Sequence, residues 1–436
     1  MLTKTVLLAR HLLPISPSNK VLDDHGVVIQ DGRILAIGPN RSLLTSHPDA
    51  EEIDLRHHIV MPGLINAHGH LPMSLLRGIG DGQTLNTWLR ETIWPLEANI
   101  VSRDFVAVGT QLAIAEMLSL GVTTASDMYY FPDVTAAVAT KSGFRAQIAF
   151  PIIELPNQYS NTVDECIHRG VELSDDYRST TTIHPAFGPH SAYAVPNDVL
   201  TRVFTLAAEI GIPVQMHIHE TAQEVRTARE QFGHSWIEYL DQHGMLLPEL
   251  QAVHMTALTR QEIARVAERG VKVIHCPYSN LKLSSGTCPI AELYDAGITV
   301  ALGTDGAASN NALDLLSEAR LALLLANYRN KNTTRVSPAQ VLESATLGGA
   351  RALGLETEIG SIEPGKAADL IAIDVDKPSL QPLFDAHTQL IHTPAANHVS
   401  HTWVEGKLLY ENGSYKRLDI EEIIASAQTW RKKVLE

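Results

Sequence analysis

The chain has 436 residues, of which 44% are hydrophobic and 19% are charged, and its formal net charge is −15. This length exceeds what a single hydrophobic core usually supports, so we predict one large domain and one smaller domain. The negative charge argues against nucleic acid or an anionic membrane as a partner.

The first 60 residues are expected to form short strands and turns. The segment "GVVIQDGRILAIG" (26–38) contains two apolar runs joined around Asp31 and Gly32, a pattern typical of a β-hairpin. The segment "HTWVEGKLLYENG" (401–413) repeats this pattern near the other end, and "AADLIAIDVD" (367–376) adds a strand. Residues 418–436 are expected to form a terminal helix, with acidic residues early and basic residues late.

Between these ends, short β-rich runs alternate with helical stretches such as 104–121 and 197–211. Eight such runs are candidate strands: 58–67, 121–128, 144–153, 181–189, 213–220, 250–255, 271–277 and 298–306. Eight strand–helix units predict an α/β fold, a (β/α)₈ TIM-like barrel. A doubly wound open sheet is the alternative, but no GxGxxG follows a strand.

The two ends are expected to pair into one small sheet. We therefore predict a small β-sandwich domain, with the C-terminal helix, from residues 1–59 and 365–436, and a barrel from residues 60–364.

Three cysteines, Cys166, Cys276 and Cys288, form no CxxC pair, which is typical of a reducing compartment. The N-terminus lacks the layout of a signal peptide, and the apolar runs are far shorter than a membrane span. We expect a cytoplasmic protein that neither crosses a membrane nor binds nucleic acid. A homo-oligomer is compatible with the sequence.

Residues of the types that bind metals close most of the candidate strands. In a barrel the carboxyl ends of all strands meet on one face, so these side chains would converge. Histidine and carboxylate are the ligands expected of a catalytic divalent metal such as zinc. The residues are His68, His70, His190, His217, His219, Glu220, His254, His275 and Asp305.

A single histidine at a strand end is more often a hydrogen-bonded packing residue. This reading is preferred for His275 and for one of His217 and His219. Alternation along a strand does not choose between His217 and His219, because both would face the same side.

The motifs "PGLINAHGH", "QMHIHET", "HCPYSNLKL" and "LGTDGAASNN" resemble those of the amidohydrolase superfamily, and more narrowly those of the 5′-methylthioadenosine/S-adenosylhomocysteine deaminases. The likeness extends to "EIGSIEPGKAADLIAID", close to the full chain. The resemblance implies a metal held by His68, His70, His217 and Asp305. It also implies that Glu220 is the acid/base, while His254 and Asp305 act on the attacking water.

Two-metal members bridge their ions with a carboxylated lysine at a strand end. No lysine lies between Lys141 and Lys272, so we predict one divalent ion per chain, with zinc the first choice. Fe²⁺, Mn²⁺ and Ni²⁺ also suit these ligands.

The resemblance assigns substrate contacts to Trp88 near the 5′ group, Glu97 at the ribose hydroxyls, His190 against the purine and Glu220 at a ring nitrogen. The alternative for Trp88 and Glu97 is an amphipathic segment with a core tryptophan and a solvated acid. Segment 151–161 contains no Lys or Arg for a homocysteine carboxylate, which favours the methylthio substrate.

We therefore predict a metal-dependent hydrolase that deaminates an adenosine-type nucleoside, with 5′-methylthioadenosine ahead of S-adenosylhomocysteine and adenosine. The alternative is a guanine or pterin deaminase or a chlorotriazine hydrolase. Enzymes of these kinds would lack a ribose-binding glutamate, so Glu97 argues mildly against them. A non-enzymatic barrel is disfavoured by the intact ligand set. The absence of CxxC excludes a zinc deaminase of the nucleic-acid type.

Overall fold

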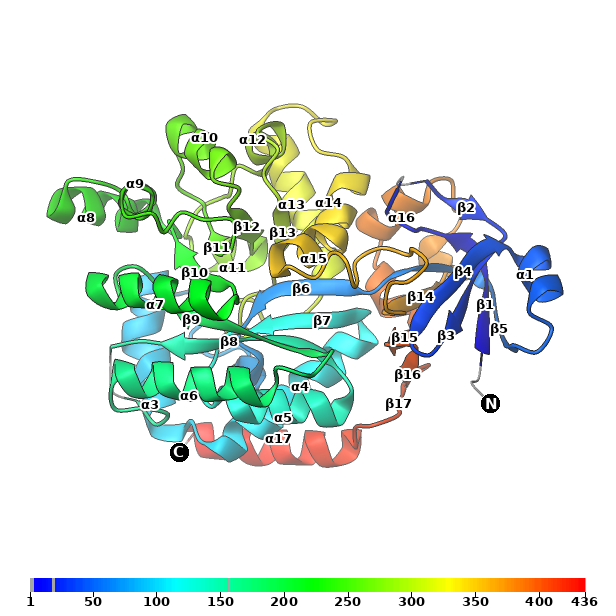
Figure 1. Cartoon of the computed structure of the whole chain (residues 1–436), viewed down its shortest axis with the longest axis horizontal. Helices are drawn as coiled ribbons and strands as arrows, with labels where there is room; N and C mark the ends of the chain where they lie inside the picture. The colour runs from blue at the N-terminus through cyan, green and yellow to red at the C-terminus, as the bar shows by residue number, and fades with distance from the viewer. Residues whose placement is uncertain (1–3, 18–19, 155–156, 436) are drawn as a thin grey trace.

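The computed structural model describes residues 4–17, 20–154 and 157–435, and its larger part is a barrel (Figure 1). Among these residues, eight parallel strands pair in the order β13-β12-β11-β10-β9-β8-β7-β6. The amide of Asp305 donates to the carbonyl of His68 (3.0 Å), which links the last strand to the first. The strands are β6 (Leu64–Gly69), β7 (Val122–Asp127), β8 (Arg145–Ile152), β9 (Ile183–Pro189), β10 (Val214–Ile218), β11 (Leu250–His254), β12 (Lys272–His275) and β13 (Val300–Leu302). The predicted barrel is confirmed.

Helices follow the strands, and several begin at a side-chain cap. Thr259 and Ser235 form capping boxes with the glutamate three residues later, which satisfies free amides of the first turn. The helices of the barrel are α4 (Arg103–Ser119), α5 (Pro132–Ser142), α6 (Val163–Asp176), α7 (Asn197–Ile210), α8 (Ala222–Phe232), α9 (Trp236–Gln242), α10 (Arg260–Glu268), α11 (Pro277–Lys282), α12 (Ile290–Asp295), α13 (Leu315–Arg329), α14 (Pro338–Ser344) and α15 (Leu347–Leu353).

The first predicted barrel strand, residues 58–67, is divided between two sheets. Its first half ends β5 (Glu51–Pro62) in the small sheet, and its second half begins β6. Pro62 cannot donate to a ladder, and a side chain at Gly63 would overlap Thr123, so the chain changes sheets at this point. The expectation of one continuous strand was therefore wrong.

Strands from both ends of the chain form one mixed sheet, as predicted. Its order is β17-β16-β15-β14-β5-β1-β3-β4, with β2 beside β1. The N-terminal β5 pairs antiparallel with the C-terminal β14, so backbone hydrogen bonds join the N-terminal and C-terminal parts of the chain. The strands are β1 (Lys4–Leu12), β2 (Leu22–Asp23), β3 (His25–Gln30), β4 (Arg33–Pro39), β14 (Leu370–Asp374), β15 (Val399–Val404), β16 (Lys407–Glu411) and β17 (Ser414–Tyr415).

The terminal helix α17 (Ile420–Leu435) lies along the barrel and runs away from the strands that precede it (Figure 1). Its Trp430 is buried edge-on against Phe105 of α4, with ring centroids 5.3 Å apart. We keep as a proposal the division into residues 1–59 with 365–436 and residues 60–364. In that division α17 is a segment of the small domain that packs on the barrel.

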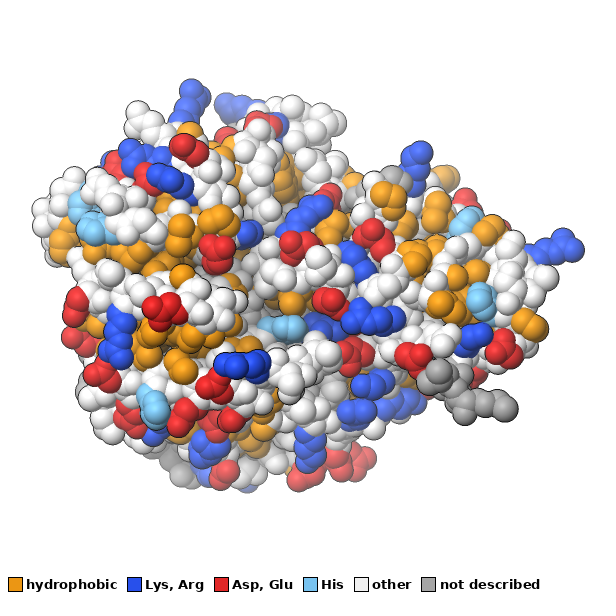
Figure 2. Space-filling view, in the orientation of Figure 1, with side chains coloured by type: hydrophobic (Ala, Val, Ile, Leu, Met, Phe, Trp, Pro, Cys, Tyr) orange, Lys and Arg blue, Asp and Glu red, His pale blue; other side chains and the backbone are white. Residues whose placement is uncertain are grey.

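None of the described helices combines the length and the apolar character that a membrane span requires. Figure 2 shows Lys and Arg side chains mixed with Asp and Glu on the face in view.

Candidate metal centre and active site

Three histidines and one aspartate converge at the carboxyl end of the barrel. His68 and His70 come from the end of β6, His217 from β10, and Asp305 follows β13. One potential ligand atom from each lies within 4.8 Å of every other. Gly303 permits this approach, because a side chain there would come within 2.8 Å of the His68 carbonyl oxygen.

Each of these histidines has its Nδ1 next to an oxygen acceptor. The acceptors are Gln215 Oε1 for His68 (2.8 Å), the Met128 carbonyl for His70 (2.5 Å) and the His190 carbonyl for His217 (2.6 Å). Burial lowers the pKa of His68 and of His217, so in these neutral rings Nδ1 carries the donated proton and Nε2 presents a lone pair. Burial acts to lower the pKa of His70 as well, but the contact with Asp305 outweighs it and raises that pKa to about 9, so binding of a metal at its Nε2 would release a proton. This outer layer of acceptors is typical of metal-ligating histidines.

The Nε2 atoms of His68 and His217 lie only 3.1 Å apart. With both Nδ1 protons committed to oxygens, two lone pairs face each other across this gap in a buried site. A cation between them removes that repulsion. The donor set, three imidazoles and one carboxylate, therefore fits a divalent metal such as zinc.

Asp305 directs one carboxylate oxygen at the histidines and the other at two hydroxyls. Its Oδ1 lies 3.2 Å from His70 Nε2, while Oδ2 accepts from Ser279 (2.5 Å) and Ser309 (3.0 Å). Burial acts to raise the pKa of Asp305, but the contacts with His68 and His70 outweigh it and hold that pKa well below its usual range. Asp305 is therefore an anion, as a metal ligand must be.

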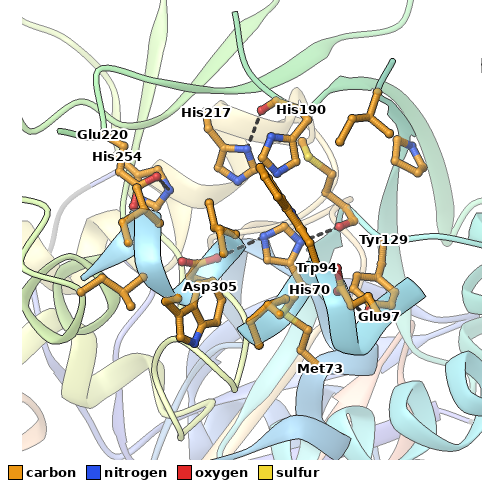
Figure 3. A pocket seen from close by; sticks show the side chains of 18 of the residues that line it. His70, Met73, Trp94, Glu97, Tyr129, His190, His217, Glu220, His254 and Asp305 are labelled. Atoms are coloured by element: carbon orange, nitrogen blue, oxygen red, sulfur yellow. Dashed lines mark hydrogen bonds and ion pairs between the residues drawn. The ribbon is translucent and has the colours of Figure 1, made fainter. Parts of the chain in front are cut away.

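Glu220 and His254 lie beside the ligand cluster without belonging to it (Figure 3). Glu220 Oε2 is 3.6 Å from His254 Nε2, and both residues are buried. Burial, with a smaller contribution from Asp305, raises the pKa of Glu220 to about 8. Burial lowers the pKa of His254 to about 4. At neutral pH the site therefore holds a protonated carboxyl beside a neutral imidazole.

Besides His190 and His254, two further histidines at strand ends, His219 and His275, lie outside the ligand cluster. His219 has a left-handed backbone (φ 52°), which turns the chain after β10, and its Nδ1 bonds to the Ala257 carbonyl. His275 is buried at the end of β12 and is not in the cluster. For His219 the contact with Ala257 agrees with the expected hydrogen-bonded packing residue. His275 is a buried packing residue, but its Nδ1 has no hydrogen-bond partner among the described residues.

A cavity of about 740 Å³, counted to its open mouth, contains this site (Figure 3). Trp88, Glu97 and His190, which the resemblance assigned to substrate, all line it. Trp88 begins a π-helical turn (η2, Trp88–Ile93), and Glu97 lies on the next helix, α3 (Trp94–Ile100). The interpretation of Glu97 as a solvated acid does not hold, because its side chain is buried.

Figure 3 shows Glu97 on the opposite side of His70 from Glu220. Tyr129 donates to Glu97 Oε1 at 2.6 Å. Burial raises the pKa of Glu97 to about 7, and the Tyr129 hydrogen bond opposes that rise. The cavity thus presents one acidic group at each side of the ligand cluster.

Several residues of the site were not predicted from the sequence. Tyr129 follows the end of β7, so its strand-end position could have identified it as a candidate site residue. Gln215 lies within β10 and had no such signal. Ser279, Asn280 and Ser285 lie after β12, within or next to the "HCPYSNLKL" motif, but nothing in their spacing indicated their contacts.

The family model named Amidohydrolase family matches residues 59–409. The chain is 42% identical over 426 residues to a protein of Teredinibacter turnerae named 5-methylthioadenosine/S-adenosylhomocysteine deaminase, covering 98% of this chain and 96% of that protein. A protein of the same name from Saccharophagus degradans is 41% identical over 429 residues, with 98% and 96% covered.

Solved structures superpose on the chain over nearly its full length. A zinc-bound adenosine deaminase from Xanthomonas campestris superposes with a TM-score of 0.98 at 42% identity, covering 99% of each chain. The zinc complex of an atrazine chlorohydrolase from Arthrobacter aurescens gives 0.92 at 26% identity, covering 98% of this chain and 100% of that one. On these matches, over nearly its whole length, the chain belongs to the amidohydrolase family and, within it, to the 5-methylthioadenosine/S-adenosylhomocysteine deaminases.

Proposed function

We propose that this protein hydrolyses the exocyclic amino group of an adenosine-type nucleoside, producing the inosine analogue and ammonia. One observation carries the proposal: a buried carboxyl with a pKa of about 8, Glu220, adjoins a four-ligand metal site without being one of its ligands. The zinc-bound adenosine deaminase that superposes on this chain supports zinc as the metal.

Zinc, when bound by His68, His70, His217 and Asp305, makes water acidic enough to supply hydroxide near neutral pH. Glu220, protonated, donates to the ring nitrogen next to the attacked carbon, which makes that carbon electrophilic. Asp305 accepts a proton from the attacking water and passes it toward the leaving amino group. His254 orients the attacking oxygen. Water adds to the carbon and ammonia leaves, so the sum is one water consumed for one ammonia released.

The ribose and the purine are assigned to the remaining cavity residues. Glu97, which accepts a hydrogen bond from Tyr129, is assigned to the ribose hydroxyls as their acceptor. His190 is assigned to the purine and Trp88 to the 5′ group. Burial lowers the pKa of His190 to about 4, so it meets the purine as a neutral ring.

The 5′ substituent is proposed to be small and uncharged, as in 5′-methylthioadenosine. Among the described residues that line the cavity, none is Lys or Arg, and the apolar ones include Leu85, Leu89 and Ile153. Within segment 151–161, Leu155 and Pro156 lie outside the described residues, and Glu154 is exposed and acidic. A homocysteine carboxylate would therefore be desolvated without a counter-ion, which is costly. Arg90 is the cation of the 85–100 segment, but it is exposed and does not line the cavity.

A substrate panel tests the proposal through ammonia release. The panel comprises 5′-methylthioadenosine, S-adenosylhomocysteine, adenosine, guanine, a pterin and a chlorotriazine, the last followed by chloride release. We expect the highest kcat/KM for methylthioadenosine and a value at least ~10-fold lower for S-adenosylhomocysteine, the scale of one unpaired buried charge contact. Turnover of guanine, pterin or triazine alone would overturn the nucleoside assignment. Equal use of S-adenosylhomocysteine that Arg90→Ala abolishes would overturn the proposed 5′ preference.

The place of action is proposed to be the cytoplasm. All three cysteines, Cys166, Cys276 and Cys288, are buried free thiols, consistent with a reducing compartment.

A further inference from the structure

One short segment after β12 contacts Asp305, Glu220 and His254. In the proposed reaction the first two transfer protons and the third orients the attacking water. Ser279 Oγ donates to Asp305 Oδ2 at 2.5 Å, and Ser285 Oγ donates to Glu220 Oε1 at 3.0 Å. Between them, Asn280 Nδ2 lies 3.0 Å from His254 Nδ1. Ser279, Asn280 and Ser285 are all buried.

Ser279 and Ser285 each donate a hydrogen bond to one oxygen of a carboxyl group, that of Asp305 and that of Glu220 respectively. Because Ser279 and Ser309 hold Asp305 Oδ2, its Oδ1 is the oxygen left to face His70. Because Ser285 holds Glu220 Oε1, its Oε2 is the oxygen left to face His254. Each carboxyl group is thereby kept from rotating, and one defined oxygen points into the cavity.

The Asn280 contact sets the tautomer of His254. An amide nitrogen is only a donor, so His254 Nδ1 accepts and the proton of the neutral ring is on Nε2. That tautomer is also electrostatically favoured, since Asp305 acts on the ring as a nearby anion. His254 therefore faces the cavity as a hydrogen-bond donor and does not serve as the base.

The segment is itself fixed by the loop that carries Asp305. The buried carboxyl group of Glu318 accepts from the Tyr278 amide (3.2 Å) and from Asn310 Nδ2 (2.5 Å), so it joins the start of α11 to this loop. Lys282 Nζ, at the other end of α11, donates to the Ala308 carbonyl at 3.0 Å and to Asn311 Oδ1 at 2.9 Å. Both ends of the short helix are thus tied to residues 308–311.

We propose that residues 279–285 form a single positioning element, in which Asn280 sets His254 as an Nε2–H donor and Ser279 and Ser285 orient Asp305 and Glu220. Each group then has one role. His254 orients the attacking oxygen as a hydrogen-bond donor, and the carboxyl groups of Asp305 and Glu220 transfer the protons. The inference rests on the proposed function for its chemistry, but the tautomer itself is independent of any substrate.

The first test measures that tautomer in the zinc-loaded protein without substrate. Nitrogen-15 NMR of histidine-labelled protein, with the His254 signal assigned by its loss in His254→Gln, should show Nε2 protonated and Nδ1 unprotonated. Asn280→Asp replaces the donor by an acceptor and should move the proton to Nδ1. A wild-type signal with Nδ1 protonated would overturn the inference whether or not the protein deaminates nucleosides.

The second test is kinetic, with metal content measured for every variant. Asn280→Asp should lower kcat for methylthioadenosine at least ~10²-fold, the usual scale for a lost acid/base-class contact, while KM stays within about threefold. If instead Asn280 accepted from Nδ1–H, aspartate would serve as well as asparagine. Retained kcat in Asn280→Asp would therefore overturn the assignment.

Two neighbouring serines provide a matched pair for the positioning of Glu220. Ser285→Ala should lower kcat about 10-fold, the worth of one hydrogen bond to a buried carboxyl, with KM little changed. Ser284 precedes it, shares the same turn and is exposed, so Ser284→Ala should leave both constants at wild-type values. Equal losses in the two variants would mean that the turn matters only for stability and would overturn the positioning role. If wild-type protein releases ammonia from no nucleoside, the proposed function fails, while the NMR result still decides the tautomer.

Discussion

Two buried carboxyl groups with raised pKa values, Glu220 and Glu97, lie on opposite sides of the metal ligands. Burial is the main cause of both shifts, yet their neighbours differ. Glu220 faces His254 and Ser285, whereas Glu97 faces Tyr129. Both groups therefore hold a proton at higher pH than a solvated carboxyl does, and it is their neighbours that distinguish them: Glu220 lies beside His254, and Glu97 lies beside Tyr129.

Replacing Glu220 by Gln should lower kcat at least ~10²-fold, because the amide cannot donate an acidic proton to the ring. Metal content, measured by elemental analysis, should remain at the wild-type value, since Glu220 is outside the ligand cluster. Loss of the ion would make Glu220 a ligand, and an unchanged kcat would remove it from the mechanism.

The KM for methylthioadenosine should rise as pH falls from about 8 to about 6. In the proposed assignment Glu97 accepts from the ribose hydroxyls best as a carboxylate, and its pKa of about 7 means that the anion is lost on acidification through this window. In Glu97→Gln the pH dependence of KM should disappear, because the amide does not titrate.

The 2′-deoxy analogue of methylthioadenosine provides the control for that assignment. Removing the 2′-hydroxyl and replacing Glu97 delete the same contact, so their losses in kcat/KM should not add. Losses that simply multiply would show that Glu97 acts elsewhere, and the guanine, pterin and triazine alternatives would then move ahead.

At the scale of elements, α17 contributes packing to the barrel and contributes nothing to the cavity. Trp430 is 8% exposed, lies against Phe105 of α4, and carries the Lys433 ammonium over its ring at 4.1 Å. The helix thereby fixes the C-terminal segment to the domain that holds the site.

Trp430→Ala should reduce the free energy of unfolding by about 3 kcal/mol through the cavity it leaves, with kcat/KM unchanged. Urea unfolding measures this change, and activity is assayed at a temperature where both proteins are folded. Ile424 lies on the same helix but is 52% exposed, so Ile424→Ala should have little effect on stability. A loss of kcat/KM in Trp430→Ala would show that α17 is coupled to the site.

At the scale of the whole molecule, the metal ligands join three parts of the barrel. They come from β6 at one end of the strand order, from β10 near its middle, and from the loop after β13 at the other end. A bound ion therefore links distant segments of the chain, and it stabilises only the folded protein, because the unfolded chain does not hold these ligands together.

Elemental analysis should find about one ion per chain in protein purified without added metal, with zinc predominant. Removing the ion with a chelator should abolish activity and lower Tm by about 3 °C, given an ion concentration ~100-fold above its Kd. His68→Ala/His70→Ala should bind no ion and show no change of Tm with chelator. Two ions per chain, or full activity of that double variant, would contradict a single catalytic metal.

The sequence by itself determined the barrel and most of the residues that reach its active face. Strand periodicity and strand ends are local properties, and a parallel barrel places all carboxyl ends together. Local patterns were therefore enough to place His68, His70, His254 and Asp305 on that face. The hairpin at Asp31 and Gly32 was predictable for the same reason, since the turn depends on the residues within it.

Alternation along β10 did not separate His217 from His219, because it gives both the same face. The resemblance chose His217, and the tertiary structure adds the physical reason, a left-handed turn at His219 that directs its side chain away. The tertiary structure also divided the run 58–67 between two sheets at Pro62. The division depends on the close approach of Gly63 to Thr123, which the sequence of the run does not contain. The contacts of Tyr129 with Glu97 and of Asn280 with His254 join residues 32 and 26 positions apart. Such contacts depend on how strands and helices pack, and packing is a property of the whole fold that no local pattern encodes.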